Sequence, residues 1–449
     1  MDTLTKKCFS FLAVIAILSL LLAGCAGQNV TQAAPNSASG TQAAQGSDSE
    51  KTVLTLWVFE GENEYMPIIE EEYEALHPNI DLQITEFPED EYTTKIDTAL
   101  AAGSPPDIGF VYDLKYLKLK QFLAVDDLIL ENEIDLDTFN QGALTMCQYD
   151  GKLYCLGSYS GALMLFYNKD MFDAAGLAYP SSSKPMTLEE YAELAGKLTI
   201  PDTDLTQYVW GGFSAPPYWW IDQRMIFSED GRTVENVLNS PRSVGMFETL
   251  TGMIQDEFAP SQSSIDGVGI PGGINVAGNE LLAQKRVAMS ICDTTVFTRL
   301  EEEGIHWGVA PLPVPAGTEA WVPSWTDAWG VFTASQHPQE ALDFVTFIAT
   351  EGNVIRSTRL DTLPLDSAIA EKTNWAKDDE GRKQILEVIK LARPGLYFSG
   401  MWDVMNSGLD DTFLDIAEGQ LTAQESLDQA IPTLQKALDE AWETWDQIK

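Results

Sequence analysis

The chain has 449 residues, and its 68 aspartates and glutamates outnumber its 27 lysines and arginines, so its formal net charge at pH 7 is −41. This charge excludes a general nucleic-acid binder, which needs a basic surface, and it argues against electrostatic docking to anionic lipid. The length exceeds what one hydrophobic core normally holds, so at least two lobes are expected.

The N-terminal stretch has the features of an export signal. Two lysines precede an apolar run over residues 9–23, which is short for a membrane span. The letters LAGC that end at Cys25 resemble a bacterial lipobox. This resemblance implies that residues 1–24 are removed as a signal peptide and that Cys25 then carries a lipid. Residues 25–50 are mostly small and polar, which predicts a flexible tether.

The next stretch alternates between strand and helix patterns. We predict strands at 53–59, 80–84 and 107–112, with helices at 62–76 and 89–102 between them. This order predicts a mostly parallel sheet with right-handed crossovers.

A hinge is predicted between Tyr149 and Met171. Asp150-Gly151 suits a tight hairpin turn, and the small residues at 157, 158, 160 and 161 precede an apolar strand over 162–167. Two cysteines, Cys147 and Cys155, flank the turn. A two-residue loop would put them on opposite faces and a three-residue loop would set them opposite each other, so a disulfide is possible but does not follow from the sequence.

The second half of the chain carries clear helix starts. Capping boxes stand at Thr187–Glu190 and Thr422–Glu425, and Ser240-Pro241 opens another helix. Further strands are predicted at 287–291, 308–313 and 328–333, and a helix at 338–350. In the last helix, Trp442 and Trp445 continue the apolar face, so they are expected in the core.

Five segments together resemble the family 1 extracellular solute-binding proteins of sugar ABC importers. They are Leu54–Trp57, His77–Ile80, Ala99–Ile108, Tyr167–Leu177 (YNKDMFDAAGL) and Gly308–Pro313. The resemblance implies an α/β, two-lobed periplasmic-binding-protein-like fold of type II. It has mostly parallel sheets flanked by helices, and a hinge between the lobes. The first lobe would comprise 51–160 and 330–364, and the second 161–329 and 365–449.

The resemblance also implies a function. Such a protein captures a mono- or oligosaccharide between its lobes and delivers it to the transmembrane subunits of an ABC permease. It would be exported and held by its lipid at the outer face of the cytoplasmic membrane. A monomer without a cofactor is expected, with no nucleic-acid partner and no membrane contact other than the lipid.

Polar candidates for the ligand site follow the predicted strands. In an open parallel sheet the ligand crevice lies beyond the carboxyl ends of the strands. Glu60 and Asn63 follow the first strand, and Asp113 follows the third. Their oxygens can accept hydrogen bonds from sugar hydroxyls. Glu62 and Glu64 are instead interpreted as favouring the start of the next helix.

Aromatic candidates lie in stretches without helical periodicity, where indole faces can stack on a pyranose. The chosen set is Trp219, Trp220, Trp325 and Trp402. Tyr159 in the hinge and Asp327 beside Trp325 join the predicted site. Asp293 joins it as well, although the Gly and Trp that the family carries in this stretch are missing here.

Catalysis is not predicted. The three histidines, at 77, 306 and 337, have no metal-ligand spacing, and no nucleophile elbow, phosphate loop or dinucleotide fingerprint is present. No catalytic residue, metal or cofactor is therefore assigned. The alternatives are a secreted lipoprotein glycoside hydrolase, which needs two carboxylates across one cleft, or the same fold binding a polyamine, a peptide or an oxyanion. The acidity makes the oxyanion least attractive.

Overall fold

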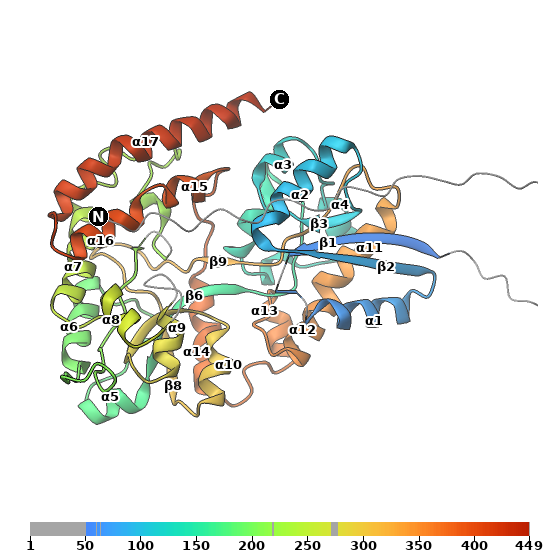
Figure 1. Ribbon diagram of the computed structural model, residues 1–449. Helices are drawn as coiled ribbons and strands as arrows, with labels where there is room; N and C mark the ends of the chain where they lie inside the picture. The colour runs from blue at the N-terminus through green and yellow to red at the C-terminus, as the bar shows by residue number, and fades with distance from the viewer. Residues whose placement is uncertain (1–50, 60, 63, 218–219, 271–276, 449) are drawn as a thin grey trace, which may run out of the picture. The chain divides into compact units, whose positions relative to one another are not determined.

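The structure is a computed structural model, and it describes residues 51–59, 61–62, 64–217, 220–270 and 277–448 (Figure 1). These residues belong to one compact unit, which spans Glu50–Lys449 and contains two larger sheets. The predicted signal peptide, the predicted lipid attachment site Cys25 and the predicted tether lie outside the described residues.

The first sheet has the strand order β10-β3-β1-β2. Its strands are β1 (Thr52–Phe59), β2 (Ile80–Phe87), β3 (Ile108–Phe110) and β10 (Trp329–Val331). The first three are parallel, as predicted, and β10 joins β3 in the antiparallel direction. Leu54, Leu56 and Val58 are buried at alternate positions of β1, because side chains alternate between the faces of a strand.

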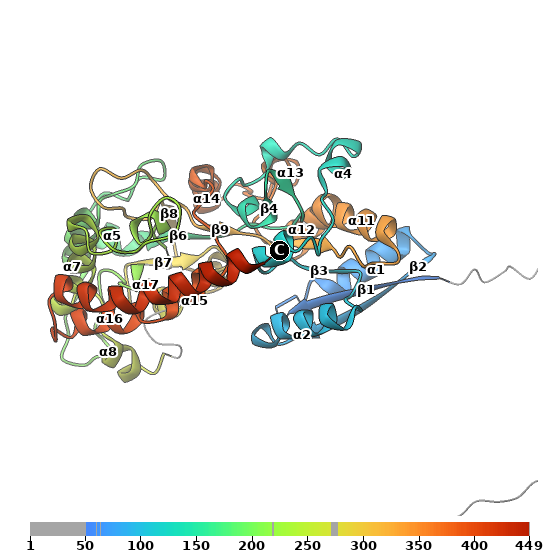
Figure 2. The same ribbon diagram turned by 90° about the horizontal axis from the view of Figure 1, so that it is seen from above.

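Helices cover this sheet on both faces (Figure 2). They are α1 (Met66–Leu76), α2 (Glu89–Ala102), α3 (Leu114–Lys118), α4 (Asp126–Glu131), α11 (Pro338–Phe347) and α12 (Asn353–Arg359). The ring of Tyr73 on α1 meets Phe344 and Phe347 of α11 edge-on. On α2, the Tyr92 hydroxyl accepts from the Phe110 N–H and donates to the Trp57 carbonyl, which fixes that helix against β3 and β1.

The second sheet departs from the expected mostly parallel arrangement. Its central strand is β6 (Gly161–Asn168), and the strands paired with it are β7 (Met289–Asp293), β8 (Trp307–Ala310) and β9 (Ser324–Trp325). All three run antiparallel to β6. A β-α-β pattern predicts parallel neighbours only for strands that follow one another, whereas β6 pairs with strands from more than a hundred residues further along the chain.

The helix starts predicted at Thr187, Ser240 and Thr422 are confirmed. Both capping boxes are formed, Thr187 with Glu190 and Thr422 with Glu425, and Ser240 caps the helix that Pro241 begins. The helices around the second sheet are α5 (Lys169–Ala175), α6 (Leu188–Leu198), α7 (Pro241–Gln255), α8 (Gln262–Gly267), α9 (Ala277–Ala283), α10 (Val296–Glu302), α14 (Glu380–Val388), α15 (Met401–Asn406), α16 (Leu409–Ala417) and α17 (Ala423–Gln447). The short helix α13 (Ser367–Lys372) lies between α12 and α14.

Two large apolar cores correspond to the two sheets. Buried residues from 54–156 and 328–349 form the first core, and buried residues from 162–322 and 363–438 form the second. We refer to the elements around each core as the first lobe and the second lobe.

A disulfide joins Cys147 to Cys155 across the predicted hairpin. The strand pairing joins Gln148 to Leu153 and Tyr149 to Lys152, so the turn has two residues. If both cysteines lay in the strands, such a turn would put them on opposite faces and exclude the bond. That argument does not apply, because Cys147 ends a 3-10 helix (Ala143–Cys147) rather than lying in the strand.

Within the described residues, no helix combines the length and apolar character needed to cross a membrane. The same part of the chain contains no group of three or more histidine, cysteine, aspartate or glutamate side chains that could hold a metal ion.

Candidate functional site

Three backbone segments cross side by side between the two lobes, at residues 156–163, 323–329 and 360–366. Leu156 and Trp329 exchange backbone hydrogen bonds of 3.1 and 2.9 Å, which join the first crossing segment to the second. The Ser160 N–H donates to the Leu363 carbonyl at 2.8 Å, which joins the first to the third. The chain passes from one core to the other only through these segments. A movement of one lobe relative to the other would therefore require changes in their backbone angles.

Asn140 of the first lobe contacts all three crossing segments. Its side-chain amide donates to the Ser160 hydroxyl at 3.2 Å, and its Oδ1 accepts from the Ser324 hydroxyl at 3.3 Å. Its backbone N–H donates to the Leu365 carbonyl at 2.9 Å. The residue is buried, so one side chain and its own backbone hold the three segments in register.

Two glycines allow the first and second crossing segments to approach closely. A Cβ at Gly161 would collide with the indole of Trp325, including Cδ1 at 2.8 Å. A Cβ at Gly157 would collide with the Thr326 hydroxyl and lie 2.6 Å from the Asp327 carbonyl oxygen. Gly157 and Gly161, two of the four small residues that predicted the hinge, are therefore required for the close approach of the two segments.

Asp327 is the buried hydrogen-bond acceptor of the second crossing segment, and only 3% of it is exposed. Its oxygens accept from the Ser158 N–H at 2.6 Å, the Ser158 hydroxyl and Trp329 Nε1 at 2.7 Å. Arg356 Nη1 donates at 3.1 Å. In this conformation the carboxylate joins the crossing segments and is not open to a ligand, which differs from its predicted role as a ligand contact.

Arg356 on α12 is the cation at this junction. Its guanidinium makes a bidentate pair with Glu62, with distances of 2.9 and 3.2 Å, and it lies between the rings of Tyr65 and Tyr159 at 4.4 and 4.2 Å from their centroids. Burial alone would lower the pKa of Arg356, but the carboxylates of Glu62 and Asp327 raise it above its ordinary value. The guanidinium therefore stays charged and links Glu62, which follows β1, to Asp327 in the second crossing segment.

Glu62 has a different role from the one predicted for it. The helix α1 begins at Met66, and the Glu62 carbonyl accepts the N–H groups of Tyr65 and Met66. Its side chain is buried, and burial raises the pKa of Glu62 although Arg356 opposes this effect. No local pattern could reveal this, because its partner lies 294 residues away in the sequence.

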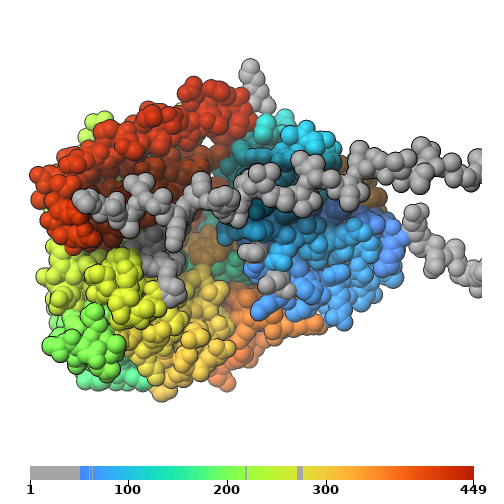
Figure 3. Space-filling model, in the orientation of Figure 1, coloured from blue at the N-terminus to red at the C-terminus, as the bar shows by residue number. Residues whose placement is uncertain are grey.

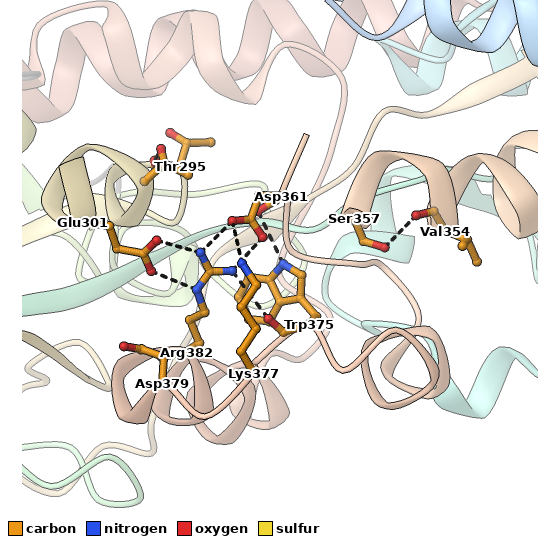
Figure 4. A network of polar contacts seen from close by, with 10 residues as sticks. Thr295, Glu301, Val354, Ser357, Asp361, Trp375, Lys377, Asp379 and Arg382 are labelled. Atoms are coloured by element: carbon orange, nitrogen blue, oxygen red, sulfur yellow. Dashed lines mark hydrogen bonds and ion pairs between the residues drawn. The ribbon is translucent and has the colours of Figure 1, made fainter. Parts of the chain in front are cut away.

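A second buried guanidinium, that of Arg382 on α14, holds the third crossing segment (Figure 4). It binds both oxygens of Glu301 at 2.8 Å and both oxygens of Asp361 at 2.6 Å. Burial would raise the pKa of Asp361, but Arg382 lowers it below its ordinary value. Asp361 has φ +58°, a left-handed backbone conformation that is unfavourable for residues other than glycine. Arg382 therefore holds the third crossing segment at its strained residue.

The predicted polar residues lie in separate places. Asp113 caps α3 by accepting from the Lys115 N–H at 2.8 Å. Asp293 ends β7 and accepts from the Thr295 N–H at 2.7 Å, and burial raises its pKa. Glu60 and Asn63 lie outside the described residues.

The predicted aromatic residues differ in exposure. Trp325 and Tyr159 are half-buried at the crossing segments, and Trp402 on α15 is 38% exposed. Trp220 is 2% exposed within the second core, where its indole packs against apolar side chains and is closed to a ligand in this conformation. Trp219 lies outside the described residues. The structure thus brings Tyr159, Trp325 and Asp327 together at the crossing segments.

The family of the chain follows from comparison with known proteins. The model of the family "Bacterial extracellular solute-binding protein" matches residues 60–355, which is more than half of the chain. The chain therefore belongs to the bacterial extracellular solute-binding proteins, a family of binding proteins rather than of enzymes.

Two named relatives are proteins that bind sugars. The chain is 27% identical over 264 residues to an arabinooligosaccharide-binding protein of Bacillus subtilis, covering 56% of this chain and 55% of the relative. It is 23% identical over 295 residues to a lactose-binding protein of Rhizobium radiobacter, covering 62% and 65%. The matches thus span less than two thirds of either relative.

Solved structures share the two-lobed α/β fold. An ABC substrate-binding protein of Listeria monocytogenes in complex with cycloalternan superposes with a TM-score of 0.70 at 22% identity, over 87% of this chain and 99% of that one. The sugar-binding protein MalE of Xanthomonas citri also gives 0.70, at 15% identity over 88% and 100%.

Proposed function

We propose that this protein is the substrate-binding component of an ABC importer, which encloses a mono- or oligosaccharide between its lobes and releases it unchanged to a membrane permease. The family and the sugar-binding relatives support the ligand class. The observation that carries the proposal is the set of three adjoining crossing segments, with the half-buried rings of Tyr159 and Trp325 at the same place.

The proposed lobe boundaries follow the crossing segments. The first lobe comprises 51–160 and 330–364, and the second comprises 161–329 and 365–449. Closure of the lobes would proceed by a shift in population, because a ligand that touches both lobes only when they are closed stabilises that form by its difference in affinity.

The proposed ligand contacts combine stacking with hydrogen bonds. They are Glu60, Asn63, Asp113, Tyr159, Trp219, Asp293, Trp325 and Trp402. Trp220 is not among them, because it lies in the second core. Asp327 is not among them either, because its oxygens already accept hydrogen bonds from Ser158 and Trp329. Each aromatic stack contributes about 0.5–1.5 kcal/mol beyond the area that it buries. Two stacks with several hydrogen bonds are compatible with a micromolar dissociation constant, which corresponds to a binding free energy of about −8 kcal/mol.

We further propose export, lipid attachment at Cys25 to the outer face of the cytoplasmic membrane, and a monomeric protein without a cofactor or catalytic step. Attachment by lipid fits the charge of −41, which repels an anionic bilayer.

A thermal-shift screen with the purified protein tests the ligand class. Arabino-, manno-, malto- and galacto-oligosaccharides form one arm, and a polyamine, a short peptide and phosphate form the others. We expect a carbohydrate to raise the melting temperature and to be recovered intact. If only the polyamine, the peptide or phosphate raised the melting temperature, the ligand would not be a carbohydrate. Multiple turnover of an oligosaccharide would indicate a glycoside hydrolase.

A further inference from the structure

The last helix changes lobes along its length. Helix α17 has 25 residues, and at 1.5 Å per residue it is about 37 Å long. Its buried residues Leu427, Leu434 and Leu438 belong to the second core. Trp445, two turns beyond Leu438, packs instead against the first core. Figures 1 and 2 both show the C-terminal end of α17 beside the first lobe, and Figure 3 shows its red surface reaching the cyan surface of that lobe.

The two tryptophans of this helix therefore have different partners. Trp442 stays with the second lobe, where its Nε1 donates to the Gly231 carbonyl at 2.6 Å and its ring stacks on Phe398. Trp445 was expected in the same core, but its carbonyl accepts from Lys118 Nζ, and that ammonium lies 4.5 Å from the centre of its ring. The ring also meets Tyr149 edge-on, with centroids 5.9 Å apart.

The first-lobe partners of Trp445 are firmly placed. Tyr149 lies on the hairpin that the Cys147–Cys155 disulfide closes. Lys118 ends α3, the helix that Asp113 caps. A second contact between the lobes lies next to Asp113 as well, because the Tyr397 hydroxyl donates to the Tyr112 carbonyl at 3.4 Å and the Tyr397 ring packs against both cores.

We propose that the last turn of α17 is a clasp, in which Trp445 holds the lobes together and thereby sets ligand affinity without touching the ligand. This inference rests on the proposed function, since it places the clasp on the element that also carries Asp113, a proposed ligand contact. A ligand that draws the second lobe toward Asp113 brings the same elements together, so clasp and ligand favour the same arrangement.

Surface plasmon resonance with a carbohydrate found in the screen tests the clasp. Trp445→Ala removes an edge-to-face ring pair and a cation–π contact. We expect the carbohydrate to dissociate from this variant roughly five to thirty times faster than from wild type, with little change in its association rate. Trp445→Phe keeps a ring and should recover most of the loss. Lys118→Met should weaken binding in wild type and cost less in Trp445→Ala, where the ring contact is already gone and only the hydrogen bond to the backbone carbonyl of residue 445 is left to lose.

The controls separate a clasp from a folding defect. Glu443→Ala changes an exposed residue of the same helix and should bind like wild type. A misfolded fraction would lower the amount of active protein while leaving the dissociation rate of the rest unchanged, and that outcome would overturn the clasp. So would unaltered binding by Trp445→Ala.

Hydrogen exchange of the ligand-free protein tests the clasp even if no carbohydrate binds. Peptides that cover 112–118 and 148–153 should exchange faster in Trp445→Ala and not in Trp445→Phe, while peptides of α7 stay unchanged. Absence of carbohydrate binding by wild type would reject the proposed function alone, whereas unchanged exchange in these peptides would reject the clasp.

Discussion

Glu62 and Arg356 form a bidentate ion pair inside the protein, between the segment that follows β1 and a helix 294 residues further along the chain. The same guanidinium binds Asp327 in the second crossing segment. A buried ion pair gives little net stability over a well-packed apolar substitute, but removing one partner leaves a buried charge without compensation. The ion pair matters here for position, because Arg356 holds Glu62 next to Asp327 of the second crossing segment.

The first prediction concerns the loss of this cation. Arg356→Met leaves Glu62 and Asp327 buried without their counter-charge, and we expect the free energy of unfolding to fall by about 3–5 kcal/mol. Arg359→Ala is the matched control, since Arg359 lies on the same helix but pairs with Glu72 at the surface. It should cost at most about 1 kcal/mol. Urea unfolding measures both, and equal losses would contradict the role given to Arg356.

The second prediction concerns pH. Because burial raises the pKa of Glu62 in the folded state, its stabilising contribution is full below the pKa of the unfolded chain, near 4.3, and is lost as the pH rises through the folded pKa. Glu62→Gln stays neutral throughout. The stability of wild type minus that of Glu62→Gln should therefore fall as the pH rises above about 4.3. Urea titrations at each pH would contradict this if the difference grew with pH, which would mean that Arg356 dominates.

The third prediction concerns the close approach at Gly161. In Gly161→Ala the added methyl group collides with the Trp325 indole, so the ring must move. We expect carbohydrate affinity to fall roughly tenfold, the upper end of what one aromatic stack supplies. Calorimetry on Trp325→Ala with and without Gly161→Ala should then show little further loss. Gly245→Ala, which meets open space on α7, is the control and should keep full affinity.

The fourth prediction concerns the hairpin disulfide. Trypsin cleaves after Lys152, so peptide mapping without reductant should recover Cys147 and Cys155 on two linked peptides. The double change Cys147→Ala, Cys155→Ala should lower the unfolding free energy by about 2–3 kcal/mol. This loss is modest because a disulfide that closes a short loop removes less entropy from the unfolded chain than one that closes a long loop. Recovery of both cysteines as free thiols from oxidised protein would contradict the bond.

Local features of this chain were predictable from the sequence. The capping boxes at Thr187 and Thr422 and the parallel β1–β3 unit depend on neighbours within a few residues or on consecutive strands. The small residues at Gly157 and Gly161 likewise marked the place where the segments touch.

Features that depend on distant partners were not predictable. The antiparallel partners of β6, the cations Arg356 and Arg382, and the change of lobe along α17 each join segments far apart in the chain. Trp445 shares the helical spacing of the core residues before it, and only the position of the first lobe distinguishes it. Of the proposed ligand contacts, Tyr159 and Trp325 lie together at the crossing segments.

Native mass spectrometry of the purified protein with an oligosaccharide tests the central claim most directly. If two lobes joined by the three crossing segments enclose a carbohydrate and release it unchanged, each chain should bind one molecule, and denaturation should return that molecule at its original mass. Shortened sugar after incubation, or no retained carbohydrate across the panel, would contradict the account.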